Sequence, residues 1–201
     1  MGTFTQIPQN TFDELQMDAG IVLTTFDPAN PTVDNANIVT ATTGGIQVNC
    51  TPSYSDFGED VDNCPNNTKE LKHLDSWECT MSFTAIGVGE DMIKLALGAV
   101  ETTSGTSVIK PNADLEQSAF KDLWWVGDKA NGGFVAVKLL NALSTGGFQL
   151  QTTKNGKGQV EVELTGHVSI NAQKTMPMEF YVGEPSEPEG ATGATGETTG
   201  A

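Results

Sequence analysis

An acidic run, Asp60-Val61-Asp62-Asn63, is the first stretch whose residue types and spacing could support chemistry, because alternating carboxylates can bind calcium. An EF-hand loop that began at Asp60 would need glycine at its sixth position and a carboxylate at its twelfth. Pro65 and Leu71 occupy those positions, so the motif is absent. A looser calcium site remains the alternative to a set of solvated loop acids, which is the interpretation we favour.

Histidine and cysteine offer a second possible chemistry, as zinc ligands or as a catalytic pair. His73 and His167 are the only histidines, and with Cys64 or Cys79 they match no zinc spacing. The sequence has no GxSxG nucleophile elbow, no Walker A motif and no GxGxxG run. A hydrolase that uses His167 and nearby acids is therefore the weakest hypothesis. We predict a protein that is not an enzyme and that uses no catalytic residue, metal or cofactor.

The three cysteines, Cys50, Cys64 and Cys79, are an odd number. The N-terminus lacks the charged-then-apolar pattern of a signal peptide, so we expect free thiols in a reducing cytoplasm. Cys50 and Cys79 also fall among the apolar positions of their segments. Packing is therefore the favoured role for both, ahead of a metal ligand or a disulfide.

Trp124 and Trp125 form the densest aromatic spot and could stack a sugar or a base. Neighbouring residues of a strand point to opposite faces, so we expect one tryptophan in the core and the other at an interface. With the acidic loop, this pair supports an alternative function, a carbohydrate-binding or adhesive β-sandwich module.

Two alternating segments must position the remaining polar residues. The first alternates Ile46, Val48 and Cys50 with polar residues, and the second alternates in the same way from Trp77 to Ala85. Such patterns predict strands with one buried face and one wet face. Roughly twenty residues separate the two segments, and a connection of that length is typically functional or disordered. We interpret it as a surface for partners, with carboxylates at Asp56, Glu59, Asp60 and Asp62.

The rest of the chain follows the same patterns. An extended arm is expected over residues 1–19, a helix over residues 89–98, and a hairpin turn at Asn155-Gly156. Further strands are expected at residues 20–26, 38–41, 123–126, 134–143, 148–153, 159–170 and 178–183. The sequence thus predicts a mainly β fold, a β-sandwich or partial barrel flanked by one short α-helix, with an extended N-terminal arm and a long loop.

Length and composition limit the domains and the partners. We expect one domain over residues 1–183 and a flexible, acidic, Gly/Thr-rich tail over 184–201, which has no large apolar residue to offset the entropy of ordering. Acids outnumber bases 26 to 10, for a formal net charge of −16. A surface that grips DNA needs clustered basic residues, which are absent here. No apolar run approaches the roughly twenty residues of a membrane span, so no membrane partner is expected.

The order of segments resembles that of the major tail (tail tube) proteins of long-tailed, siphovirus-like bacteriophages of Gram-positive hosts. The likeness covers roughly residues 20–183 and rests on these runs: TTGGIQVN, YSDFGEDVDNCPNNTKE, WECTMSFTA, KLALGA, DLWWVGDKANGGFVAVKLLNAL, STGGFQLQTTKNGKGQVEVELTGHVSI and P-x-E-F-Y-V. It implies a β-sandwich flanked by a helix, in subunits that form hexameric rings and stack into a tube. In this family the inner sheets of neighbouring subunits join in a continuous β-barrel around the lumen.

The resemblance also implies the partners and the location. These are other copies of the chain, the tape measure and tail-end proteins, and double-stranded DNA that passes transiently without adhering. The protein would be part of the virion tail, assembled in the host cytoplasm. The tail at 184–201 departs from a minimal tube protein, and is either an outward extension or the stub before a longer, frameshifted form.

The residues fit such a conduit, because an acidic lumen repels phosphate and lets a duplex slide. On this hypothesis Val48, Trp77, Phe83, Val160 and Val162 belong to the core, and the polar residues between them face the lumen. The lumen candidates are Gln47, Asn49, Glu78, Thr80, Ser82, Glu161 and Glu163. The loop at 55–75 and the N-terminal arm would reach an adjacent ring or subunit, with Asp56, Glu59, Asp60 and Asp62 as the contact candidates.

Overall fold

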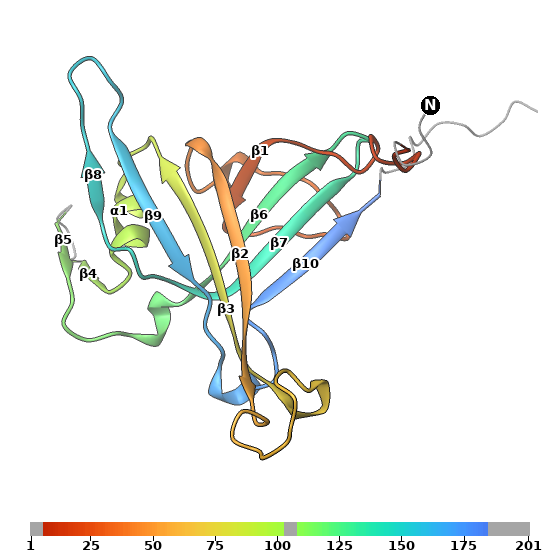
Figure 1. Ribbon diagram of the computed structural model, residues 1–201. Helices are drawn as coiled ribbons and strands as arrows, with labels where there is room; N and C mark the ends of the chain where they lie inside the picture. Colours follow the sequence, from red (N-terminus) through yellow and green to blue (C-terminus); the bar gives the residue numbers. More distant parts are fainter. Residues whose placement is uncertain (1–5, 103–107, 185–201) are drawn as a thin grey trace, which may run out of the picture.

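Strands dominate the chain. The computed structural model describes residues 6–102 and 108–184, and within these ranges ten strands and one α-helix follow one another (Figure 1). The helix is α1 (Glu90–Leu97). The strands are β1 (Gln16–Leu23), β2 (Thr42–Asp56), β3 (Lys72–Ala85), β4 (Val100–Thr102), β5 (Ile109–Pro111), β6 (Lys121–Lys129), β7 (Phe134–Ser144), β8 (Gln149–Gln151), β9 (Gln159–Thr165) and β10 (Met178–Gly183). The predicted mainly β fold with one short helix is confirmed.

Strand β7 divides the main sheet into two halves. The strand order is β1-β6-β7-β9-β3-β2, with β10 beside β7 and β8 beside β9. The first part of β7 pairs with β6 and β10, whereas Leu143 and Ser144 at its end pair with β9. Asn141, with a φ of +46°, marks the point where the strand changes partners. We call β1, β6, β7 and β10 the β6 half-sheet, and β2, β3, β8 and β9 the β3 half-sheet.

The main core lies between the two half-sheets. Alternate residues of β3 and β9 meet residues of β1, β6, β7 and β10, and burial of each such aliphatic side chain stabilises the fold by about 1.5–3 kcal/mol. Helix α1 adds Met92 and Ala96 to this core. The helix begins with Glu90 and Asp91, where its partial positive charge favours carboxylates, and ends at Gly98, whose φ of +73° suits a residue without a Cβ.

The β6 half-sheet is also buried on its other face. Trp124, Val126 and Ala136 form a second cluster with Leu23 and Phe26, and the ring of Phe26 meets that of Trp124 edge-on at a centroid distance of 5.6 Å. Within residues 6–102 and 108–184, no such cluster covers the outer face of the β3 half-sheet. The two half-sheets therefore differ. The β6 half-sheet is packed on both faces along β6 and β7, although Phe180 and Val182 of β10 are exposed, whereas the β3 half-sheet keeps one face for solvent or for a partner.

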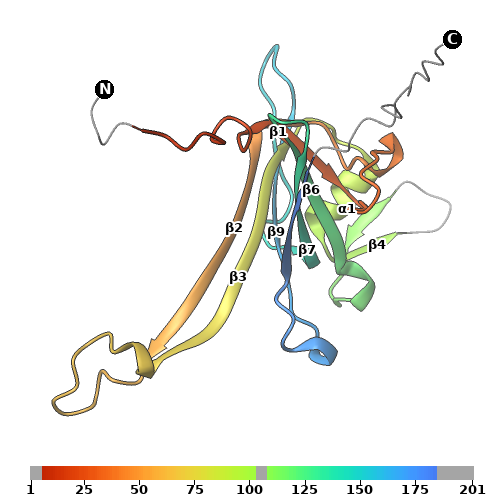
Figure 2. The same cartoon turned by 90° about the vertical axis from the view of Figure 1, so that its right-hand side faces the viewer.

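The ribbon of β2 and β3 is longer than the sequence suggested. The predicted loop of roughly twenty residues was too long, because β2 continues to Asp56 and β3 starts at Lys72. The two strands leave the body together as a protruding arm, with residues 57–71 as its tip (Figure 2). Outside the body neither strand has a core to face, so the hydrophobic alternation that identifies a strand is lost there.

Other boundaries also differ from the prediction. β1 begins at Gln16 and ends at Leu23, so residues 16–19 belong to a strand and not to the extended arm. The strand expected at 38–41 is reduced to one bridge between Ile38 and Leu23. The strand expected at 159–170 stops at Thr165. At the next residue, Gly166, the chain passes so close to Pro177 that a Cβ atom would lie 3.0 Å from it.

The predicted tail lies outside the described residues except for Glu184, whose carboxylate is 3.3 Å from Lys129 Nζ. The first five residues of the predicted N-terminal arm lie outside them as well. None of the helices described is long and apolar enough to span a membrane.

Candidate functional site: a polar sheet face and a protruding arm

The seven predicted lumen residues share the outer face of the β3 half-sheet. The strand register places them in cross-strand rows: Gln47 opposite Ser82 and then Glu163, Asn49 opposite Thr80, and Glu78 one row further along β3. Glu161 pairs with Thr84, in the row beyond Glu163. All of them are exposed except Thr80 and Ser82, which are half-buried by their neighbours. A continuous polar surface therefore spans β2, β3 and β9.

The opposite face of these strands is apolar. Phe83, Val160 and Val162 are at most 4% exposed, and Val48 and Trp77 pack against the same core. In β9 every second residue is buried, so its glutamates are held outward by the burial of their neighbours. The alternation of polar and apolar residues in the sequence thus produces one polar face and one apolar face, as predicted.

The list of lumen candidates left out four further members of the polar face. Thr51 lies opposite Glu78, Thr165 opposite Thr80, and Thr84 and Gln149 flank Glu161. Three of these residues continue an alternation that was already visible, so the signal was present. Gln149 lies in the strand expected at 148–153, of which only residues 149–151 form β8. All three residues are exposed, so burial does not distinguish the two faces of this strand.

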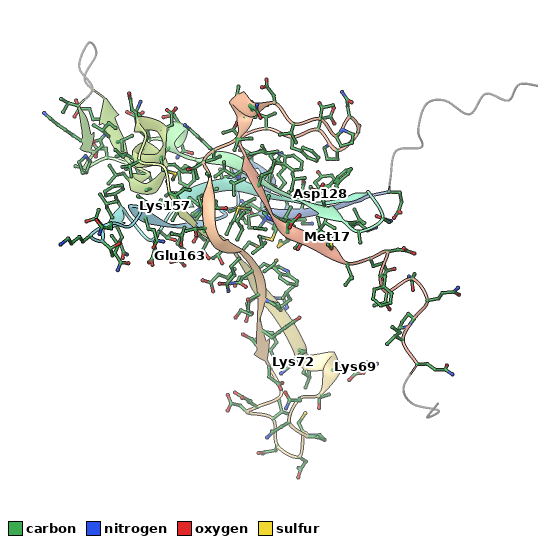
Figure 3. The ribbon with its side chains drawn as sticks, turned by 90° about the horizontal axis from the view of Figure 1, so that it is seen from above. Met17, Lys69, Lys72, Asp128, Lys157 and Glu163 are labelled. Carbon is green, nitrogen blue, oxygen red and sulfur yellow. The ribbon has the colours of Figure 1, made fainter. Side chains whose placement is uncertain are left out.

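The polar face is acidic and its carboxylates are unpaired. Glu78, Glu161 and Glu163 take part in none of the ion pairs among the described residues (Figure 3 labels Glu163). All ten basic residues of the chain are lysines, and none of them lies in the facing segments 42–51, 78–84 or 161–165. The face therefore presents uncompensated negative charge among hydroxyl and amide groups, which repels other anions.

An open hollow indents one end of this face. It has a volume of about 400 Å³ and lies where β2 bulges after Thr43. Gly44 and Gly45, with φ of +78° and +89°, have no side chain to fill it. Glu161 and Glu163 are the charged groups in its wall, so the hollow is no site for an anion.

The four acidic candidates of the arm have different roles. Asp56 Oδ1 accepts a hydrogen bond from the Gly58 amide at 2.9 Å, Oδ2 accepts one from the Asn67 amide at 3.0 Å, and Lys72 Nζ lies 3.6 Å away. The Gly58 hydrogen bond, then the Asn67 bond and the Lys72 charge, lower the pKa of Asp56. Asp56 thus ties the two ends of the tip together.

Glu59, Asp60 and Asp62 are all exposed at the tip and take part in none of the ion pairs of the described chain. They are free to contact another molecule. Nowhere in residues 6–102 and 108–184 do three or more histidine, cysteine or acidic side chains gather as metal ligands would.

The tryptophan pair does not form a sugar platform. Trp124 is 7% exposed and packs between Phe26 and Tyr181, with Lys138 Nζ 5.5 Å from the centre of its ring. Trp125 points to the other face, against the main core, and its Nε1 donates to the Ala19 carbonyl at 3.0 Å. Stacking on a sugar requires an open ring face. Trp124 is buried and Trp125 is half-buried on the opposite face of the strand, so the two rings do not form one open platform.

The two histidines lie in separate surroundings. His73 is on the arm, where its ring is 5.8 Å from that of Phe57. His167 follows β9, with Nδ1 3.2 Å from the Asn141 carbonyl oxygen and Phe120 against its ring at 5.2 Å. Each ring is thus held by local structure.

Comparisons with known proteins find little. No protein-family model matches the chain, and no curated protein matches it. Among solved structures, one match is a chain of the structure described as "Virion of native gene transfer agent (GTA) particle". The identity is 8% and the TM-score is 0.41, over 81% of this chain and 95% of that chain. A similarity of this size carries no argument about this protein.

Proposed function

We propose that this chain is a structural virion protein whose subunits form rings, hexameric by the resemblance described above, that stack into a tail tube. The acidic lumen of that tube conducts double-stranded DNA, and the protein carries out no reaction. The observation that carries the proposal is the outer face of the β3 half-sheet, which is wide, polar, negatively charged and left uncovered by the subunit's own fold.

The chemistry of this face suits passage and not binding. A protein that holds DNA replaces its counterions with lysine and arginine, and here the facing segments have neither. Carboxylates at Glu78, Glu161 and Glu163 repel the phosphates, while the threonine and serine hydroxyls between them are small and leave the surface smooth. A duplex can then slide along the wall without a strong contact at any point.

The edges of the β3 half-sheet support ring formation. β2 is the last strand in the strand order, so one of its edges has no strand partner within the described chain. An edge of fifteen residues is long, and unpaired N–H and C=O groups on such an edge favour pairing with another chain. Closure of the sheets into a ring of subunits would satisfy these edges and would place every polar face toward one axis.

The charges at the two ends of the subunit support stacking. The acidic tip of the arm and the hairpin between β8 and β9 lie at opposite ends of the molecule (Figures 1 and 2). The hairpin carries Lys154 and Lys157, which are exposed and belong to none of the ion pairs of the described residues. In a head-to-tail stack the acidic tip of one ring would meet the basic hairpin of the next. The tape measure and tail-end proteins are the further partners that this assignment implies.

Negative-stain electron microscopy of the purified chain tests the proposal. We expect rings or tubes of one regular diameter. A species that stays strictly monomeric at high concentration, and in the presence of tail-assembly partners, would contradict it.

A further inference from the structure

Two cysteines face each other at the root of the arm. Cys50 on β2 and Cys79 on β3 are direct partners in the strand register, and their Sγ atoms lie 3.1 Å apart. Cys79 is fully buried and Cys50 is half-buried against the same core. The third cysteine, Cys64, is at the tip of the arm, where its Sγ lies 3.5 Å from Thr68 Oγ1.

The backbone geometry of this pair suits a covalent bond. Gly166 N donates to the Cys79 carbonyl at 2.9 Å, so the carbonyl of Cys79 points toward the β9 side of β3. In an antiparallel strand the N–H and C=O of one residue point to the same side, so Cys50 and Cys79 form a non-hydrogen-bonded pair. Such pairs have Cα atoms about 4.5 Å apart, at the short end of the range found for disulfides.

We propose that Cys50 and Cys79 are an oxidation site that closes to a reversible cross-strand disulfide, and that Cys64 takes no part in it. The oxidant is a low-molecular-weight disulfide such as oxidised glutathione. The Cys50 thiolate attacks one of its sulfurs and releases one glutathione thiol. Cys79 then attacks Sγ of Cys50 and releases the second. The protein loses two protons and two electrons, and the oxidised glutathione becomes two reduced molecules.

The order of the two attacks follows from burial. Cys50 reacts first because solvent reaches it, whereas Cys79 has none of its surface exposed. Burial, and then the neighbouring Cys50 thiol, raise the pKa of Cys79 to about 12. Closure is therefore the slow step, and its rate should increase as the pH rises from neutral, because the thiolate fraction of Cys79 increases.

The bond would hold the arm at the point where it leaves the body. It would close a loop of about thirty residues that contains the whole arm, and so restrict the unfolded chain. We expect the midpoint of thermal unfolding to rise on the order of 5 °C. Since the Cα separation is at the short end of the range, the bond should also be readily reduced.

The test uses the purified full-length chain, incubated with oxidised glutathione, quenched with acid and analysed by mass spectrometry without reduction. We expect a mass lower by two hydrogens, a cross-link between the peptides that contain Cys50 and Cys79, and full reversal by dithiothreitol. The Cys64→Ser variant should behave identically, and it is the matched control. Cys50→Ala should neither lose the two hydrogens nor show the thermal shift.

Three outcomes overturn the proposal. The first is that Cys50 and Cys79 both remain alkylatable after oxidation. The second is that the cross-link includes Cys64, and the third is that the reaction stops at a glutathione adduct on Cys50. Because these measurements are made on the wild-type chain, they do not depend on the folding of a variant. They also do not depend on whether the protein forms a tube.

Discussion

At the scale of single residues, Asp56 shows how one carboxylate can organise a loop. Its two oxygens accept hydrogen bonds from the amides of Gly58 and Asn67, on opposite sides of the tip. The sequence alone suggested four equivalent acids, because all four lie in one polar run. The hydrogen-bond partners of Asp56 are backbone amides, which cannot be identified from residue types. Its structural role was therefore not predictable from the sequence, whereas the exposure of Glu59, Asp60 and Asp62 was.

The lowered pKa of Asp56 predicts how the tip responds to acid. A group whose pKa is lower in the folded state stabilises the fold above its ordinary pKa of 3.8, and that contribution is lost as the pH falls through the lower value. We expect the protection of the Gly58 and Asn67 amides against hydrogen exchange, measured relative to the unfolded chain at the same pH, to persist down to about the ordinary carboxyl pKa and to decrease below it. Asp56→Asn should remove this dependence, while Asp60→Asn should leave it. Loss of protection already near neutral pH would contradict this role.

Two leucines on the paired strands β8 and β9 differ in burial, although Leu150 lies opposite Val160, four residues before Leu164. Leu164 on β9 is fully buried, and Leu150 on β8 is 46% exposed. Leu164→Ala should lower the free energy of unfolding by about 2–5 kcal/mol, because it removes buried methyl groups and leaves a cavity. Leu150→Ala should change it by about 0.5 kcal/mol or less. Urea unfolding measures both, and equal effects would contradict the placement of the core.

At the scale of elements, periodicity was a reliable guide wherever a strand has a core on one side. β9 follows the pattern residue by residue, and so do the body segments of β2 and β3. It failed on the arm, where Ser53, Tyr54 and Leu74 are all exposed and hydrogen bonds alone define the ribbon. It also failed for the segment after β1, because Phe26 covers the sheet from outside any strand. Which strands pair, and which residues pack over a sheet, depend on segments that are distant in the sequence. A local pattern of residues does not contain this information.

Charge reversal on β9 tests the lumen assignment. Glu161→Lys combined with Glu163→Lys places two cations per subunit on the polar face, where they would attract phosphate. We expect tubes of unchanged appearance, because neither side chain contributes to the core, and infectivity reduced about tenfold or more, because the genome adheres during ejection.

The matched control for that variant is Asp114→Lys combined with Glu116→Lys. It makes the same change in net charge on an exposed segment before β6. This control should remain fully infectious. If the β9 variant forms tubes and is equally infectious, the lumen assignment is wrong.

At the scale of the whole molecule, the acidic arm tip and the basic hairpin lie at opposite ends (Figures 1 and 2), and their opposite charges predict that rings stack head to tail. Lys154→Glu with Lys157→Glu should leave rings intact but shorten the tubes several-fold. Each lost surface contact is worth about 0.2–1 kcal/mol, and a ring repeats it for every subunit. Adding Asp60→Lys and Asp62→Lys should restore the length, as measured by electron microscopy at low salt.

Lys110→Glu with Lys174→Glu is the control for this exchange, because it alters two exposed lysines elsewhere. It should leave the length distribution unchanged. If the four-residue exchange does not restore the tube length, the arm tip does not contact the hairpin between β8 and β9. If the unaltered protein forms no rings, the tube proposal itself is wrong.

The unequal cover of the two half-sheets has a consequence for what can be altered. The core of this subunit is packed by every other position of β9, so the exposed positions between them, such as Glu161 and Glu163, contribute no side chain to the core. Metal chelators, reactive thiols or dyes could be installed there, and if the subunits stack in rings as proposed, each ring would repeat them at a regular pitch. The subunit would then serve as a template for a nanoscale pipe whose inner coating is chosen by the engineer.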